Sequence, residues 1–352
     1  MASHAPPRLT ELLSRARRLA LVGLAKNTGK TETLTAILAE HAAASRPVGV
    51  TSIGRDGEAH DVIDARIEKP RLNLAEGGLV ATTGELLRAS GLAHERLQQT
   101  GVRTPLGEVV VARLSEAGTV EVAGPSAAAD VRAVSDAMLE LGAEQVLIDG
   151  AIDRRAASSP AVADGLLMAT GAVLGKDIAQ VVARTADAVD LVRLRRAAEQ
   201  ASSGGAGEAP RAGGESVQAE RRLVLNAEPV EIAALLSEHP RAGTLIVDGA
   251  LSERFLEGLL AARRERAGRQ LRIIVADPTK VFLSRRGPRW YARQGLAIEV
   301  RHTIELMAIT VNPLAPQSHR FDSLELRELI EAAVSEVPVL DVLDPSYLAL
   351  AK

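Results

Sequence analysis

The stretch LALVGLAKNTGKT, residues 19–31, determines how the rest of the chain is interpreted. Its first five residues are apolar without a break, which predicts a buried strand. From Glu32 to Ala44 the sequence then places Leu34, Ile37 and Leu38 at helical spacing. The polar loop between them therefore connects a buried strand to a helix. This is the context that a phosphate-binding loop requires.

The loop contains the residue types that hold phosphate. At the start of a helix, consecutive backbone N–H groups face an anion and the helix dipole adds a favourable potential. Gly29 lets the backbone approach closely, Lys30 is expected to bridge the β- and γ-phosphate oxygens, and the Thr31 hydroxyl is expected to ligate Mg²⁺. A lysine that points to solvent is the alternative for the loop's first lysine. The predicted nucleotide-binding residues are Lys26, Asn27, Thr28, Gly29, Lys30 and Thr31.

The loop departs from the usual motif at its first glycine. Leu24 stands at that position, and the nearest glycine, Gly23, is displaced by one residue. The Gly-Lys-Thr end, which makes most of the phosphate contacts, is intact. The alternative to a phosphate site is a chance Gly-Lys-Thr at the start of a helix.

A triphosphate site also needs a carboxylate for magnesium, normally at the end of a neighbouring strand. Asp149 follows the apolar run Val146–Ile148, so we expect it to act with Lys30 as a catalytic residue and to complete the magnesium sphere; a carboxylate that caps the next turn is the alternative. Asp56 is a further predicted metal ligand. It lies with Glu58 in a loop that could sense the γ-phosphate, although ordinary turn chemistry explains Asp-Gly equally well.

A second polar segment follows the Asp149 strand. Asp153 and Arg154 are close enough in sequence to reach a substrate or nucleotide, and a surface ion pair is the alternative.

The wider pattern predicts an α/β chain. Apolar strands at 19–23, 48–53, 109–112 and 146–150 alternate with helical patterns, which indicates a parallel sheet covered on both faces. Gly, Ser, Ala and Glu dominate residues 199–220, as in a flexible linker or insertion. We therefore expect a P-loop NTPase-like parallel-sheet domain over residues 1–198, the linker over 199–220, and a smaller α/β domain over 221–352.

The composition excludes several classes of function. The 352 residues contain no cysteine, so disulfides, thiolate zinc sites and iron–sulfur clusters are ruled out. A net charge of −3 with only 3 Phe, 2 Tyr and 1 Trp does not favour nucleic-acid binding. No apolar run approaches the roughly 20 residues of a membrane span, and no signal peptide is apparent, so we expect a cytoplasmic protein with no membrane partner. Neither a Gly-x-Ser-x-Gly elbow nor an Asp-x-His-x-x-Gly cobalamin motif occurs.

Several motifs in the same order are similar to a known family. The chain resembles the P-loop subunit of the lysine 5,6-aminomutase reactivase. The loop alone is also similar to that of the small P-loop protein of molybdopterin-guanine dinucleotide synthesis, so the choice depends on TSIGRDGE and DGAIDR. The similar stretches are GLAKNTGKT (23–31), TSIGRDGE (51–58), KPR (69–71), TPLGEVVVAR (104–113), AGPS (123–126), DGAIDR (149–154), SP (159–160), TGA (170–172) and ITVNP…FDS (309–323).

The resemblance implies a function exerted on another enzyme. It implies binding of ATP (or GTP) with Mg²⁺, a companion ATPase subunit, and restoration of an inactivated adenosylcobalamin-dependent aminomutase that acts on lysine or a related amino acid. The chain would then be a component of a P-loop NTPase. Two other functions stay open: a P-loop small-molecule kinase or ligase, and a regulatory scaffold that binds nucleotide without hydrolysing it.

Overall fold

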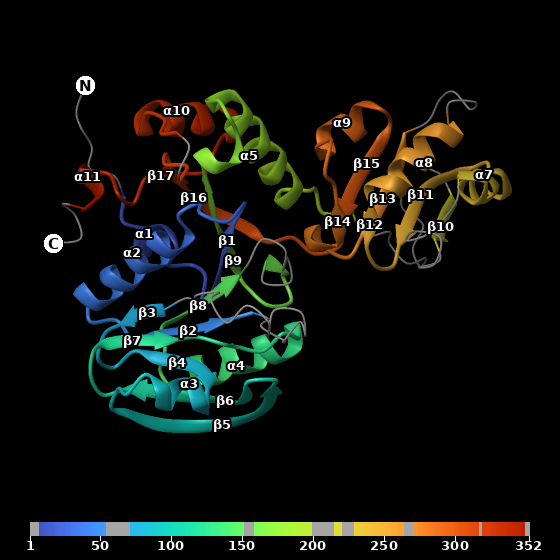
Figure 1. The fold of residues 1–352 in the computed structure, drawn as a ribbon. Helices are drawn as coiled ribbons and strands as arrows, with labels where there is room; N and C mark the ends of the chain where they lie inside the picture. The colour runs from blue at the N-terminus through green and yellow to red at the C-terminus, as the bar shows by residue number, and fades with distance from the viewer. Residues whose placement is uncertain are drawn as a thin grey trace, which may run out of the picture. The chain divides into compact units, whose positions relative to one another are not determined.

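The computed structural model describes residues 7–53, 71–150, 158–198, 215–219, 229–263, 270–316 and 319–348. It divides into two compact units, coloured along the chain in Figure 1. Unit 1 comprises Met1–Ala186 and Ile304–Lys352, and unit 2 comprises Asp187–Thr303. No helix among the described residues is long and apolar enough to cross a membrane.

Unit 1 is built on one large sheet, which confirms the α/β class. In spatial order, the strands from β17 (Val339–Leu340) to β4 (Leu79–Thr83) run parallel, whereas β6 (Gly107–Leu114) runs antiparallel to both of its neighbours, β4 and β5 (His94–Thr104). This antiparallel edge departs from the parallel sheet expected from the sequence, because a two-residue turn joins β5 to β6 and permits only a hairpin. In spatial order the described strands are β17 (Val339–Leu340), β16 (Glu305–Asn312), β9 (Gly165–Gly171), β1 (Arg18–Gly23), β8 (Gln145–Gly150), β2 (Val48–Ser52), β4 (Leu79–Thr83), β6 (Gly107–Leu114) and β5 (His94–Thr104).

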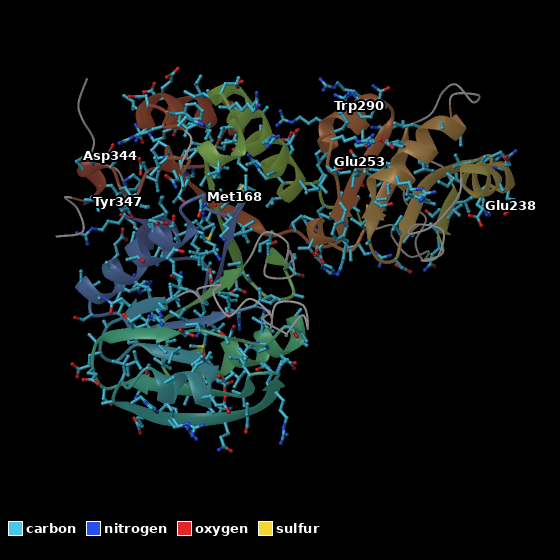
Figure 2. The ribbon with its side chains drawn as sticks, viewed as in Figure 1. Met168, Glu238, Glu253, Trp290, Asp344 and Tyr347 are labelled. Atoms are coloured by element: carbon cyan, nitrogen blue, oxygen red, sulfur yellow. The ribbon has the colours of Figure 1, made fainter. Side chains whose placement is uncertain are left out.

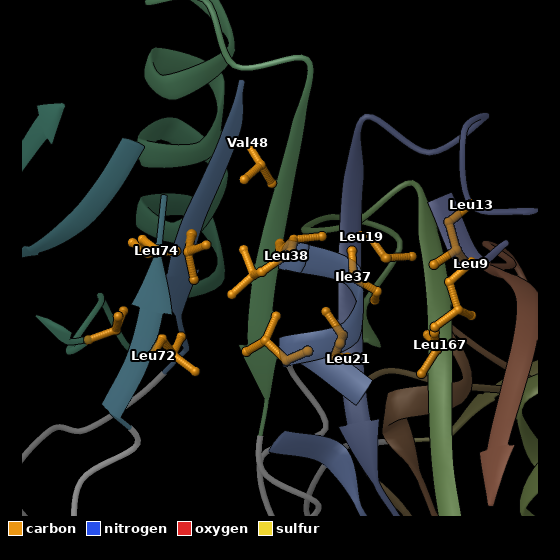
Figure 3. Close-up of a cluster of buried hydrophobic side chains, with 14 of the residues drawn as sticks. Leu9, Leu13, Leu19, Leu21, Ile37, Leu38, Val48, Leu72, Leu74 and Leu167 are labelled. Atoms are coloured by element: carbon orange, nitrogen blue, oxygen red, sulfur yellow. The ribbon is translucent and has the colours of Figure 1, made fainter. Parts of the chain in front are cut away.

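Helices pack on both faces of this sheet. On one face, Ile37 and Leu38 of α2 (Lys30–Ala43) pack with Leu19 and Leu21 of β1, and Figure 3 shows this cluster. On the other face, α4 (Ala128–Glu140) contacts β2 and β8. The remaining described elements of unit 1 are α1 (Leu9–Leu12), β3 (Arg71–Leu74), α3 (Gly84–Ala89), β7 (Gly118–Glu121), η3 (Ala172–Leu174), α10 (Ser323–Val334) and α11 (Pro345–Leu348), and α5 (Ile178–Val192) crosses the boundary of the two units.

A buried carboxylate joins the two ends of the chain within unit 1. Glu40 of α2 accepts hydrogen bonds from the Thr10 N–H at 2.9 Å, from the Thr10 hydroxyl at 2.7 Å, and from the Tyr347 hydroxyl of α11. Figure 2 labels Tyr347 of α11 and Asp344, which directly precedes this helix. Burial raises the pKa of Tyr347, and the hydrogen bond to Glu40 raises it further. The C-terminal segment is therefore an integral part of unit 1.

Unit 2 is a smaller α/β unit with its own core. Its main sheet is four-stranded and parallel, with the strands in sequence order: β10 (Glu215–Ala219), β11 (Ala242–Val247), β13 (Leu271–Val275) and β15 (Leu296–Val300). The buried cluster includes Leu245, Ile273 and Phe255. The other described elements are α7 (Pro229–Glu238), β12 (Leu251–Ser252), α8 (Glu253–Arg263), η4 (Pro278–Lys280), β14 (Val281–Phe282) and α9 (Pro288–Arg293).

These boundaries differ from the expected division at 198 and 221. The segment from Ile304 onward belongs to unit 1, because β16 pairs with β9 over seven registered positions and completes the large sheet. The expected linker, 199–220, lies largely outside the described residues, and its part Glu215–Ala219 is a strand of unit 2.

Candidate functional site

The strand order of unit 1 places a topological switch point at the end of β1. The chain leaves β1 for β2 on one side of the sheet and leaves β9 for β16 on the other. In parallel α/β sheets, ligands bind beyond the carboxyl ends of the strands where the connections diverge in this way. The loop from Leu24 to Gly29 emerges at this point, between the ends of β9 and β8.

The loop adopts a tight conformation that is anchored at both ends. Leu24 N–H donates to the Ala169 carbonyl of β9 at 2.9 Å. The buried Thr28 hydroxyl donates to the Ala25 carbonyl at 3.0 Å. Asn27 and Gly29 both have left-handed backbones, with φ of 67° and 84°. Alternation of left-handed and other conformations turns successive N–H groups toward one side, where they form a concave anion site.

The displaced glycine of the motif has a structural reason of its own. A Cβ on Gly23 would lie 2.6 Å from the Thr28 hydroxyl oxygen and 3.3 Å from the Ala25 carbonyl oxygen. The loop therefore folds back onto the end of β1 so closely that only glycine fits there. Leu24, at the usual glycine position, is instead half-buried.

The first turn of α2 offers unpaired donors. Thr33 N–H and the Thr33 hydroxyl both bond the Gly29 carbonyl at 2.9 Å. The N–H groups of Lys30, Thr31 and Glu32 have no hydrogen-bond partner among the described residues. Such donors at the start of a 14-residue helix, together with the helix dipole, attract an anion.

The structure brings Lys30 and Asp149 into contact. Leu21 of β1 is paired with Asp149 of β8, so the residue that opens α2 faces the end of β8. Lys30 Nζ lies 2.5 Å from Asp149 Oδ1 and donates to the Gly150 carbonyl at 2.8 Å. Asp149 is 8% exposed, so this ion pair is largely shielded from water. Their roles in binding phosphate and magnesium stay predictions.

The other predicted residues have different surroundings. Lys26, Asn27 and Thr31 are exposed, as groups that meet a ligand from solvent must be. Four candidates that follow β2 and β8 in the sequence lie outside the described residues: Asp56, Glu58, Asp153 and Arg154.

Sequence reasoning did not single out Asn312 as a site residue. Asn312 ends β16, and its Nδ2 donates to the Asn27 carbonyl at 3.0 Å while its Oδ1 accepts from Leu314 N–H at 3.0 Å. A Cβ on Gly29 would lie 3.1 Å from Asn312 Cβ. The side chain therefore supports the loop from a position 285 residues away. A polar amide at the end of an apolar strand and before a proline was the available signal.

The oxygen donors at this site suit magnesium shared with a phosphate ligand. The Asp149 carboxylate and the Thr31 hydroxyl are ligands of the kind that Mg²⁺ prefers. Among the described residues, no group of three or more His, Cys, Asp or Glu side chains could hold a metal without other ligands. Magnesium is commonly bound by one or two carboxylates plus substrate phosphates, so the donor set fits a metal that arrives with a phosphate ligand.

Comparisons of the chain with protein-family models, with curated proteins and with solved structures find no match.

Proposed function

We propose that the loop Leu24–Thr31 binds the phosphates of a nucleoside triphosphate together with Mg²⁺. The observation that carries this proposal is the position of Lys30. Its ammonium group lies beside Asp149 at the start of a helix whose first N–H groups are unpaired in the described structure. The site thus brings together a cation, a carboxylate and free backbone donors. These are the groups that a magnesium–triphosphate complex requires.

The ion pair between Lys30 and Asp149 indicates what these two residues do when the triphosphate and magnesium bind. Lys30 turns from Asp149 and the Gly150 carbonyl toward the phosphate oxygens, which exchanges one anionic partner for another. Asp149, released from Lys30, and the Thr31 hydroxyl are the groups that would hold Mg²⁺. When bound, Mg²⁺ neutralises charge on the phosphates and fixes their orientation.

We further propose that the chain is the nucleotide-binding subunit of an ATP-dependent reactivase for an adenosylcobalamin-dependent lysine 5,6-aminomutase or a related mutase. The support for this client is the ordered set of motifs, of which Asp149 begins DGAIDR and Asn312 lies in ITVNP. A nucleotide site of this kind can bias the conformation of a partner enzyme. ATP is the expected nucleotide, with GTP as the other possible one.

A reactivation assay tests this function. An aminomutase stalled in turnover is supplied with adenosylcobalamin, ATP, magnesium and the companion ATPase, with and without this chain. We expect activity to recover only when this chain is present, and Lys30→Ala to reduce that recovery. Recovery that is indifferent to the chain, with lysine and ornithine mutases alike, contradicts the reactivase function.

Nucleotide consumption by the purified chain separates the two other functions. ATP consumption that requires an added metabolite indicates a kinase or ligase. Tight nucleotide binding without phosphate release, alone or with the partner, indicates a regulatory scaffold.

A further inference from the structure

A short hairpin follows β16, at the carboxyl ends of the strands, where the phosphate loop also lies. Phe321 N–H donates to the Pro313 carbonyl at 2.9 Å, and Ala315 N–H donates to the His319 carbonyl at 2.9 Å. Leu314 and Arg320 form an antiparallel bridge between the two arms. The two described arms of this hairpin, 312–316 and 319–321, are thus held together by backbone hydrogen bonds.

The hairpin contacts both the phosphate loop and the first residue of η3, directly after β9. Asn312 bonds the Asn27 carbonyl and packs against Gly29, as described above. His319 Nε2 lies 3.2 Å from the Ala172 carbonyl oxygen, at hydrogen-bonding distance for a ring N–H donor. The hairpin is therefore fixed beside the loop by contacts from both of its arms.

The hairpin carries an aromatic ring that unit 1 does not use in its core. Phe321 and Tyr347 are the two members of the Phe, Tyr and Trp set in unit 1, and all six such residues of the chain are described. Tyr347 is 2% exposed and bonds Glu40, whereas Phe321 is half-buried. The Phe321 ring lies 4.6 Å from the His319 ring at an interplanar angle of 51°, so its orientation is supported from one side.

The direction of Lys30 indicates which side of the loop remains for the nucleoside. Lys30 reaches toward Asp149 and Gly150 at the end of β8. At the proposed site, Lys30 and Asp149 would therefore hold the terminal phosphates and magnesium on the β8 side of β1. The nucleoside then extends to the other side of β1, where β9 and β16 end and the hairpin begins. Base stacking on an aromatic ring tolerates any base because every base has a π-face.

We propose that the described residues of the hairpin, 312–316 and 319–321, form the nucleoside part of the site, with Phe321 stacking on the base and Asn312 holding the phosphate loop in register. This inference rests on the proposed phosphate site. Stacking on Phe321 is a contact that only a base can make. The site would therefore bind nucleoside triphosphates in preference to inorganic polyphosphates.

The test compares two magnesium-bound ligands on the full chain, ATP and inorganic tripolyphosphate, by isothermal titration calorimetry. Phe321→Leu is expected to weaken MgATP binding about tenfold and to leave tripolyphosphate binding unchanged, because only ATP carries a base to stack. Phe321→Tyr keeps a ring and is expected to bind MgATP as the parent does. Phe282→Leu is the matched control, since Phe282 is 47% exposed in unit 2.

The outcomes distinguish the inference from the function on which it rests. If the parent binds both ligands and Phe321→Leu binds MgATP unchanged, the stacking role is overturned while the phosphate site stands. The stacking role is also overturned if Phe321→Leu weakens both ligands equally, or if Phe321→Tyr loses as much affinity as Phe321→Leu. If the parent binds neither ligand, both proposals are overturned.

Discussion

At the scale of single residues, Gly29 combines a left-handed backbone with a close neighbour. Its φ of 84° lies in the left-handed region, and a Cβ there would lie 3.1 Å from Asn312 Cβ. Gly29 also supplies the carbonyl that starts the hydrogen bonding of α2 through Thr33. Loop geometry and helix initiation therefore depend on one residue.

We predict that Gly29→Ala lowers stability more than a matched glycine substitution elsewhere. Left-handed backbone costs an L-residue about 1–2 kcal/mol, and the Asn312 contact adds to this cost. Gly77→Ala is the control, because Gly77 has a similar φ of 80° but nothing within 4 Å of its Cβ position. Urea unfolding of both variants measures the difference. Equal losses of stability would show that the Asn312 contact is unimportant.

His41, at the other end of α2, makes stability depend on pH. Its Nε2 lies 3.1 Å from Gln145 Oε1, and because Gln145 Nε2 donates to the Leu13 and Ala16 carbonyls, the ring must donate to that oxygen. The ring Nδ1 is buried without a partner in the described structure. Burial lowers the pKa of His41 below its ordinary value of 6.5, and Arg46 lowers it further against the opposing hydrogen bond to Gln145.

The sign of the effect follows from proton uptake. Below pH 6.5 the unfolded chain protonates this histidine while the folded chain does not, so unfolding becomes more favourable as the pH falls. We predict a loss of up to about 1.4 kcal/mol for each pH unit between the two pKa values. Chemical denaturation of the parent and of His41→Gln, at steps of roughly one pH unit between pH 8 and pH 5, measures this loss in the free energy of unfolding. A parent that loses no more stability than His41→Gln contradicts the prediction.

At the scale of elements, the buried parallel strands and amphipathic helices could be predicted from the sequence. Continuous apolar runs identified β1, β2 and β8, and helical spacing identified α2 and α4, because burial on both faces or on one stripe produces those patterns. The strand β9 was missed, since its small residues Gly165, Ala169 and Gly171 dilute the apolar signal. The edge strand β5 was missed because its largely exposed side chains leave no buried face to detect.

The packing of α2 on β1 determines where the loop between them lies. Ile37 is fully buried in the cluster shown in Figure 3. We predict that Ile37→Ala lowers the free energy of unfolding of unit 1 by about 2–5 kcal/mol, because the lost methyl groups leave a cavity. Leu329→Ala on α10 is the control, since Leu329 is 44% exposed and its loss should cost less than about 0.5 kcal/mol. Similar destabilisation by both changes, in guanidinium unfolding, would place Ile37 outside the core.

At the scale of the whole molecule, unit 2 is an insertion in the sequence of unit 1, which begins at Asp187 within α5 and ends at Thr303 before β16. The sequence suggested two consecutive domains, because strand–helix alternation resumes after residue 220 and local patterns do not reveal which strand pairs with which. The pairing of β16 with β9 joins residues more than 130 positions apart. For the same reason, Lys30 and Asp149 could be predicted as site residues from their local motifs, whereas Asn312 became visible only once β16 was placed beside the loop.

This organisation predicts which fragments fold. A fragment of residues 187–303 contains a complete buried cluster and should unfold cooperatively on its own. A fragment of residues 1–198 lacks β16 and Asn312, so it leaves the edge of β9 exposed and should aggregate or lack cooperative unfolding. Circular dichroism with thermal melting checks both fragments. A well-folded 1–198 beside an unfolded 187–303 would contradict the division.

We propose above that Lys30 and the loop around it bind a magnesium–nucleoside triphosphate. The most direct measurement is calorimetric titration of MgATP into the full chain, compared with Lys30→Ala and with Lys280→Ala in unit 2 as the charge-matched control. We expect the parent and Lys280→Ala to bind MgATP saturably. Lys30→Ala should bind it at least about tenfold more weakly, because a charged hydrogen bond to phosphate is lost. Binding by Lys30→Ala that equals the parent's, with an unchanged melting temperature, would contradict it.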